Sequence, residues 1–184
     1  MDNTEKKIIN IIGQTNRYQI KKLLNEKKEI KKRVEIEKLN LTLEYFIFEK
    51  QLEIIKNINN IFNEEDKNAL KIIITQIEKK IRSYKQQDID KKKINNEKII
   101  NLKCIIDKLI ETEIKCYYCK TEMYILYKNV RDLKQWSVDR INNDLGHNND
   151  NFVLACLDCN LKRRCKSADK FLFTKQLNII KQDN

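Results

Sequence analysis

Apolar residues recur at steps of three and four through the first third of the chain. The clearest stripe is made of Leu41, Tyr45, Phe48, Leu52, Ile55 and Phe62. This spacing keeps side chains on one face of an α-helix. Upstream the stripe weakens, because lysines such as Lys27 and Lys31 interrupt it. The pattern predicts one long helix or two over residues 4–62.

A helix start follows at Asn63, where three acidic residues come next in the chain. The asparagine side chain can cap a helix, and acidic groups suit the positive end of its dipole. The expected buried face is Leu70, Ile73, Ile77, Ile81 and Tyr84. Residues 85–92 are polar and predict a turn, and a further helix is expected over 93–114. Residues 1–114 are therefore interpreted as a helical hairpin or coiled-coil region, serving partner contact, homodimerisation or only as a scaffold.

The pattern changes at residue 115. Aromatic and β-branched residues predict short strands at 123–127, 136–141 and 152–155, and residues 142–150 form a polar loop. Helices are expected at 157–166 and 168–180. The fold class is therefore α+β, with a long helical region followed by a small second domain over 115–184.

Charge narrows the range of partners. The net charge is +11 and the chain has no proline and two glycines. A basic excess of this size favours a polyanion such as nucleic acid, although a Lys-rich solvated surface gives the same net charge.

No apolar run approaches the roughly 20 residues that span a bilayer, so no membrane partner is expected. No signal-peptide core is present at the N-terminus. We expect a reducing intracellular compartment, the cytoplasm or nucleus, and not secretion.

Two CxxC pairs are the most specific chemical signal. Cys116 and Cys119 are separated by 36 residues from Cys156 and Cys159. Four thiolates at this spacing can close on one tetrahedral Zn²⁺. In a reducing compartment, metal binding is favoured over disulfides. Cys104 and Cys165 lie outside the pairs and are interpreted as plain thiols.

Residues 116–166 resemble the HNH endonucleases of the ββα-metal class. The resemblance rests on the CxxC pairs, an Asp ending the first strand (Asp139), an Asn opening the second (Asn151), and Cys-x-x-Cys-Asn before a basic helix. It implies a ββα-metal domain in which Asp139 and Asn160 hold catalytic Mg²⁺ or Mn²⁺, while Asn151 braces the loop and orients the general base. A zinc-ribbon or zinc-finger DNA-binding protein is the competing interpretation.

The chain departs from this family at one position. The residue after the metal-binding Asp is usually the His that activates water, and here it is Arg140. A guanidinium cannot accept a proton near neutral pH. The single histidine of the chain, His147, lies in the loop between the strands and is either the candidate base or a surface loop residue without a catalytic role. Arg140 would then bind phosphate or offset charge in the transition state.

A basic cluster follows Asn160 and is expected to contact DNA phosphates, with RNA not excluded. Its members are Lys162, Arg163, Arg164 and Lys166. Tyr117, Tyr118 and Trp136 are expected to pack around the zinc and the strands.

Three functions remain open at this stage. The leading one is a metal-dependent endonuclease that nicks DNA, free-standing or encoded by a virus or mobile element. The second is an HNH-derived zinc module that binds nucleic acid without cutting it. The third is a helical interaction protein with a structural zinc cap. Arg140 favours the second and third, whereas Asp139, Asn151 and Asn160 favour the first.

Overall fold

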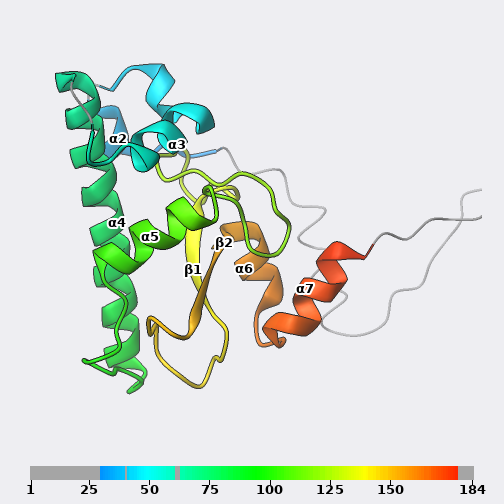
Figure 1. Ribbon diagram of the computed structural model, residues 1–184. Helices are drawn as coiled ribbons and strands as arrows, with labels where there is room; N and C mark the ends of the chain where they lie inside the picture. The colour runs from blue at the N-terminus through cyan, green and yellow to red at the C-terminus, as the bar shows by residue number, and fades with distance from the viewer. Residues whose placement is uncertain (1–29, 40, 61–62, 178–184) are drawn as a thin grey trace, which may run out of the picture. The chain divides into compact units, whose positions relative to one another are not determined.

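The computed structural model describes residues 30–39, 41–60 and 63–177 and is a mixed α+β structure (Figure 1). A compact unit begins at Lys32. Its elements in chain order are α2 (Val34–Glu37), the 3₁₀-helix η1 (Leu43–Phe46), α3 (Phe48–Lys56), α4 (Glu64–Asp90), α5 (Leu102–Glu111), β1 (Trp136–Arg140), β2 (Phe152–Cys156), α6 (Leu157–Arg163) and α7 (Ala168–Gln176).

The long helix α4 begins where the sequence predicts. The Asn63 side chain accepts a hydrogen bond from the Asp66 backbone N–H at 2.6 Å, which satisfies one unpaired donor of the first turn. The turn expected at residues 85–92 is wrong, because α4 continues to Asp90. Tyr84 packs on His147, and Asp88 is 1% exposed. These contacts keep one face of the last turns of α4 packed against the protein, although most residues of these turns are polar.

The other predicted helices are shorter than expected. In place of the one or two long helices expected over residues 4–62, the described part of this region contains α2, η1 and α3, and residues 4–29 lie outside the described residues. The helix expected over 93–114 is reduced to α5, which Asn101 caps through the Cys104 N–H. The preceding backbone pairs with the polar loop instead, since the Ile100 N–H donates to the His147 carbonyl at 3.0 Å.

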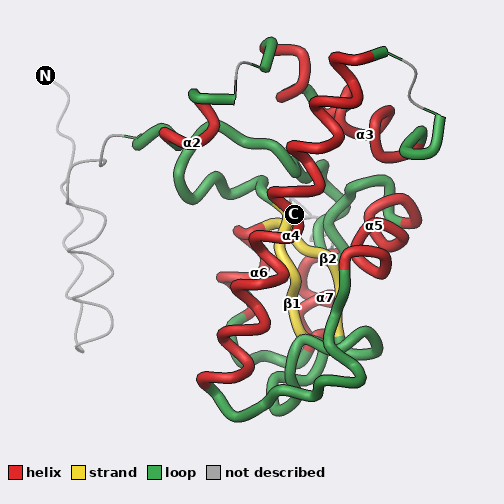
Figure 2. The backbone as a smooth tube through the Cα atoms, turned by 90° about the vertical axis from the view of Figure 1, so that its left-hand side faces the viewer, coloured by secondary structure: helices red, strands yellow, loops and turns green. Residues whose placement is uncertain are grey.

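Strands β1 and β2 pair in antiparallel register, with Trp136 opposite Cys156 and Arg140 opposite Phe152. Among the described residues the strand expected at 123–127 does not form, and Tyr124 makes only an isolated bridge to Gln135. Helix α6 contacts both strands from the side opposite α4 and α5 (Figure 1), and α7 follows it. Figure 2 shows α4 running alongside the strand pair.

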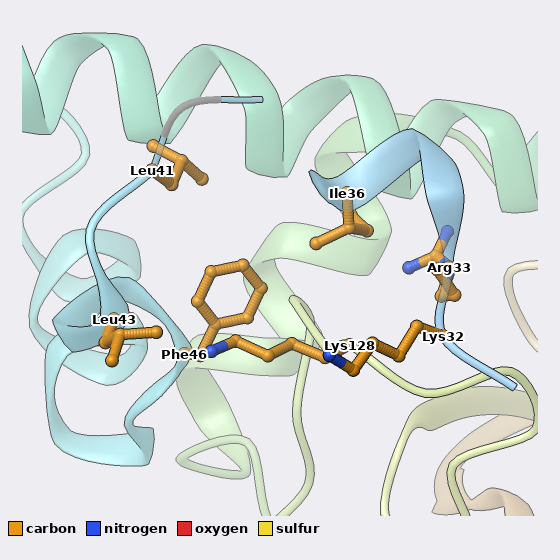
Figure 3. A pocket seen from close by; sticks show the side chains of 7 residues that line it. All are labelled: Lys32, Arg33, Ile36, Leu41, Leu43, Phe46 and Lys128. Atoms are coloured by element: carbon orange, nitrogen blue, oxygen red, sulfur yellow. The ribbon is translucent and has the colours of Figure 1, made fainter. Parts of the chain in front are cut away.

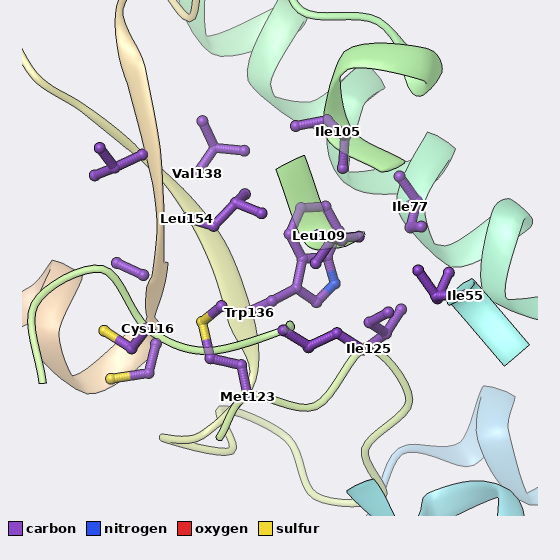
Figure 4. Packing of buried hydrophobic residues seen from close by; sticks show 14 of the residues in the cluster. Ile55, Ile77, Ile105, Leu109, Cys116, Met123, Ile125, Trp136, Val138 and Leu154 are labelled. Atoms are coloured by element: carbon purple, nitrogen blue, oxygen red, sulfur yellow. The ribbon is translucent and has the colours of Figure 1, made fainter. Parts of the chain in front are cut away.

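One hydrophobic core joins the helices to the strands. Trp136 of β1 is fully buried, and its indole points toward Leu109 of α5, Ile77 of α4 and Ile125 (Figure 4). This packing removes apolar surface of both the helices and the strands from water. Described residues on both sides of positions 114 and 115 belong to this one core, and the division into domains expected there stays a prediction.

The described helices α3, α4 and α5 pack against one another and into this core rather than forming an extended coiled-coil arm. Homodimerisation through the N-terminal helices stays a prediction, and much of that segment lies outside the described residues. Within the described ranges, no helix has both the length and the apolar character required to cross a membrane.

Candidate metal centre and strand–helix site

The four cysteines of the two CxxC pairs come together. The sulfur atoms of Cys116, Cys119, Cys156 and Cys159 all lie within 4.8 Å of one another. The Cys119 and Cys156 sulfurs are 3.8 Å apart. For Zn–S bonds of about 2.3 Å, two sulfurs of a tetrahedral site are about 3.8 Å apart. The donor set and its spacing therefore fit a tetrahedral zinc ion.

Local backbone structure aims these sulfurs at a common point. Cys116 and Lys120 close a tight turn, in which Lys120 has a positive φ of 58° and its N–H donates to the Cys116 carbonyl. Cys156 ends β2 and caps α6, with its sulfur accepting from the Cys159 N–H at 3.4 Å. The Tyr117 N–H donates to the Leu154 carbonyl at 2.9 Å, which ties the first turn to β2.

The two remaining cysteines lie outside this cluster. Cys104 lies in the first turn of α5, where its sulfur takes part in a capping box with Asn101. Cys165 is exposed, and no cysteine of the chain is in a disulfide.

Asp139 of β1 is buried beside α6 and is held by an arginine, and Asp139, Asn160 and Arg163 together are called the strand–helix site. The Arg163 guanidinium donates from Nε to Oδ2 at 2.6 Å and from Nη2 to Oδ1 at 2.9 Å. The Tyr118 hydroxyl donates to Oδ2 at 2.7 Å. Burial, with the hydrogen bond to Asp139, raises the pKa of Tyr118 and keeps its proton in place. Both carboxylate oxygens are thus occupied by donors, one of them a cation.

Asn160 faces the same strand. Its Nδ2 donates to the Ser137 hydroxyl and to the Val138 carbonyl, each at 3.1 Å. These bonds fix the amide against β1, and its oxygen remains the one possible metal ligand of this side chain. A hard divalent cation needs oxygen ligands from several groups. With Asp139 engaged by Arg163, the residues in this arrangement do not fit the expected Mg²⁺ or Mn²⁺.

His147 is buried in a pair that the sequence did not reveal. Its Nδ1 lies 2.8 Å from Asp88 Oδ1, and its backbone N–H donates to Asp88 Oδ2 at 2.6 Å. The ring stacks on Tyr84, with centroids 4.7 Å apart. Burial lowers the pKa of His147, against the opposing effect of Asp88. A carboxylate on Nδ1 favours the tautomer with its proton there, which leaves Nε2 as the basic nitrogen.

Asp88 could have been found from the helical spacing. It continues the series Ile77, Ile81 and Tyr84 at a step of four, so it lies on the buried face of α4. The polar character of the surrounding residues concealed that signal.

Two further site residues anchor the loop between the strands. Asn151 spans it, with Nδ2 donating to the Asn142 and Gly146 carbonyls at 3.0 Å each and Oδ1 accepting from the Asn142 N–H at 2.8 Å. Arg140 donates from Nη1 to the Leu145 carbonyl at 3.0 Å. The Arg140 side chain is therefore directed to the loop backbone, in contact with neither Asp139 nor Asn160 through any described hydrogen bond.

The basic cluster divides into two groups. Lys162, Arg164 and Lys166 are exposed, and Lys162 pairs with Asp158 at 2.7 Å. Arg163 is 0% exposed. The expectation that Arg163 contacts phosphate at the surface is wrong for this structure, because its guanidinium points inward to Asp139 and to the Arg140 and Lys166 carbonyls.

A separate pocket of about 370 Å³ lies near α2 and η1 (Figure 3). Lys32, Arg33 and Lys128 line it together with apolar side chains, and Lys128 extends toward Phe46, its Nζ 4.6 Å from the ring centroid. No residue of the predicted site lines this pocket.

Comparison of the chain with protein-family models, with curated proteins and with solved structures finds no match.

Proposed function

We propose that residues 116–166 form a zinc-stabilised, HNH-like module that binds nucleic acid without cutting it at Asp139. The observation that carries this proposal is the buried Asp139–Arg163 pair, with N–O distances of 2.6 and 2.9 Å. A guanidinium supplies the positive charge beside Asp139, so a divalent cation is not needed there. A protonated arginine also stands at the position of the family's usual base.

Binding is supported by charge and exposure. Arg164 and Lys166 are exposed directly after α6, and the whole chain carries a net charge of +11. Side chains of this type contact phosphates, which give affinity without selecting a sequence. The expected partner is therefore DNA or RNA bound through its backbone.

The test is a salt series of fluorescence anisotropy titrations with a duplex and a single-stranded oligonucleotide. In the double variant Arg164→Glu, Lys166→Glu, we expect weaker binding to all sequences alike. Because each lost phosphate contact removes about 0.9 from the slope of log K against log salt, the slope should fall by about 1.8. The matched control is Lys71→Glu, Lys85→Glu, which reverses two exposed charges on α4. Equal losses of affinity in both variants would count against nucleic-acid binding by Arg164 and Lys166, the α6 surface.

A second candidate is the DNA-nicking endonuclease, favoured by the paired His147 and Asp88 side chains. An imidazole whose Nδ1 is held by a carboxylate has a fixed tautomer and presents Nε2 as a proton acceptor. Hydrolysis at Asp139 would require Arg163 to withdraw first. The two candidates separate in a plasmid-nicking assay with Mg²⁺, with Mn²⁺ and with a chelator. We expect no metal-dependent nicking by the natural protein, and nicking that is lost on Asp139→Ala, Asn160→Ala and His147→Gln would establish the endonuclease instead.

A further inference from the structure

A small cavity of about 140 Å³ lies beside the middle of α4, away from the strand–helix site. Arg33, Gln76, Lys80, Ser83 and Tyr127 line it, together with Lys79 and Ile125. No acidic side chain is among these described lining residues. Basic side chains of different elements, among them Arg33 and Lys80, therefore line one cavity whose described lining residues include no carboxylate.

The Lys80 ammonium is held by neutral groups. It donates to Gln135 Oε1 at 3.0 Å and to the Trp136 carbonyl. It also lies 4.8 Å from the Trp136 ring centroid and 5.2 Å from that of Tyr127. An ammonium has three donors, so one remains for a further acceptor. Burial lowers the pKa of Lys80 to about 7, and the charge of Arg33 contributes in the same direction.

Arg33 approaches the same space from the segment before α2. It donates from Nη2 to Gln76 Oε1 at 3.0 Å and from Nη1 to the Tyr127 carbonyl at 3.3 Å. Its guanidinium carbon lies 4.3 Å from the Tyr127 ring centroid. A guanidinium has five donors in a planar fork, so these two bonds fix its plane and leave further N–H groups for an oxyanion.

We propose that this cavity binds one oxyanion of the size of phosphate or sulfate, between the Lys80 ammonium and the Arg33 guanidinium. The volume of about 140 Å³ is several times what one water molecule needs, so the cavity has room for an anion of five heavy atoms. The anion would offset the repulsion between the two cations. This chemistry is offered both by free inorganic phosphate and by a backbone phosphate of nucleic acid.

The test is calorimetric titration of the full chain with sulfate at constant ionic strength, with chloride as the reference anion. We expect Lys80→Met, which keeps the apolar stem, to weaken sulfate binding at least tenfold, and Arg33→Gln to do the same. The control is Lys71→Met, which removes an exposed lysine of the same helix and should bind sulfate like the natural protein. Sulfate binding by Lys80→Met equal to that of the natural protein would overturn the proposal.

A second measurement needs no variant and is independent of any folding defect. Sulfate keeps its charge between pH 6 and 8, so a change in its affinity reports on the protein. Of the other groups that line the cavity with Lys80, Arg33 and Lys79 are basic, and burial raises the pKa of Tyr127, so it stays neutral. For a Lys80 pKa of about 7, sulfate should bind about tenfold more weakly at pH 8 than at pH 6. In carbon-detected NMR, sulfate should raise the Lys80 pKa; an unmoved pKa with saturating sulfate would place the anion elsewhere.

The source of the anion is settled by competition. If a duplex oligonucleotide displaces sulfate and Lys80→Met also weakens duplex binding, the cavity takes a backbone phosphate. If sulfate binds and the duplex neither competes nor depends on Lys80, the ligand is the free anion. In that second outcome the α6 surface can still bind nucleic acid, so failure of the proposed function and failure of this site are distinguishable.

Discussion

Arg163 and Asp139 form a doubly hydrogen-bonded ion pair inside the protein, Nε to Oδ2 at 2.6 Å and Nη2 to Oδ1 at 2.9 Å. The two side chains come from α6 and β1, and their exposed fractions are 1% and 6%. The pair therefore fixes α6 against the strands, and the Arg163 guanidinium is the cation that Asp139 binds.

Replacing Arg163 should destabilise the fold strongly. Arg163→Met leaves the Asp139 carboxylate buried without its partner, and breaking such pairs costs about 3–5 kcal/mol. The measurement is the midpoint and free energy of urea unfolding, with zinc content followed in parallel. Arg164→Met is the control, because Arg164 is exposed and should stay within about 0.5 kcal/mol of the natural protein. Equal stability of both variants would mean that the pair contributes little.

Removing one sulfur ligand should release the metal and unfold more than its own turn. Cys119→Ser should lower the zinc content from one ion per chain to near zero, measured by atomic absorption on protein purified without chelator. The core that contains Cys116 and Cys156 also contains residues of α4 and α5, so the helices should lose structure with the metal. Cys165→Ser, at an exposed cysteine outside the cluster, should keep zinc and fold. Full zinc occupancy in Cys119→Ser would exclude a four-thiolate site.

The His147–Asp88 pair predicts a stability loss on mild acidification. Burial lowers the pKa of folded His147, whereas the unfolded chain titrates near pH 6.5. Between these two values the unfolded state binds more protons, so stability is complete above about pH 6.5 and falls as pH drops through the folded pKa. His147→Gln should remove this component of the pH dependence.

Direct titration of His147 gives an independent check, since it is the only histidine of the chain and its imidazole NMR signals need no assignment. We expect a midpoint below 6.5. Asp88→Asn should lower it further, because the Asp88 carboxylate opposes the effect of burial. A midpoint that rises in Asp88→Asn would contradict the pairing.

Gly146 should tolerate no side chain. A Cβ at this position would lie 2.4 Å from the Lys93 carbonyl oxygen and 2.9 Å from Asp88 Oδ2. Gly146→Ala must therefore move backbone, and overpacking of this kind costs about 1–3 kcal/mol. Thermal unfolding measures the loss, with Asn149→Ala in the exposed part of the same loop as control. An unchanged melting temperature in Gly146→Ala would show that the loop can move away from α4 without cost.

The features predicted correctly from sequence depend on short-range chemistry. Asn63 and its acidic neighbours define a helix start without reference to the rest of the chain. Aromatic and β-branched residues predict strands at 136–141 and 152–155, and the observed bounds, Trp136–Arg140 and Phe152–Cys156, differ by one residue each. The two CxxC pairs require only that one ion can bring them together, and the structure has all four sulfurs within 4.8 Å.

The features that were missed depend on partners distant in sequence. Residues 123–127 have strand composition, but within the described chain only Tyr124 of this range forms a bridge, to Gln135. Arg163 stands among surface cations in the sequence. Its inward direction follows only when Cys159, one turn earlier on α6, is recognised as fixed toward the core.

Helix α4 supports the strand–helix site from outside residues 116–166. Its Tyr84 hydroxyl accepts a hydrogen bond from the Val138 N–H at 3.0 Å, and its Asp88 holds the His147 loop. A fragment of residues 115–184 would keep every cysteine of the cluster yet expose Trp136 and lose both of these supports. The zinc-binding segment therefore depends on α4 for its structure. Fused to another protein without α4, it should not keep this fold.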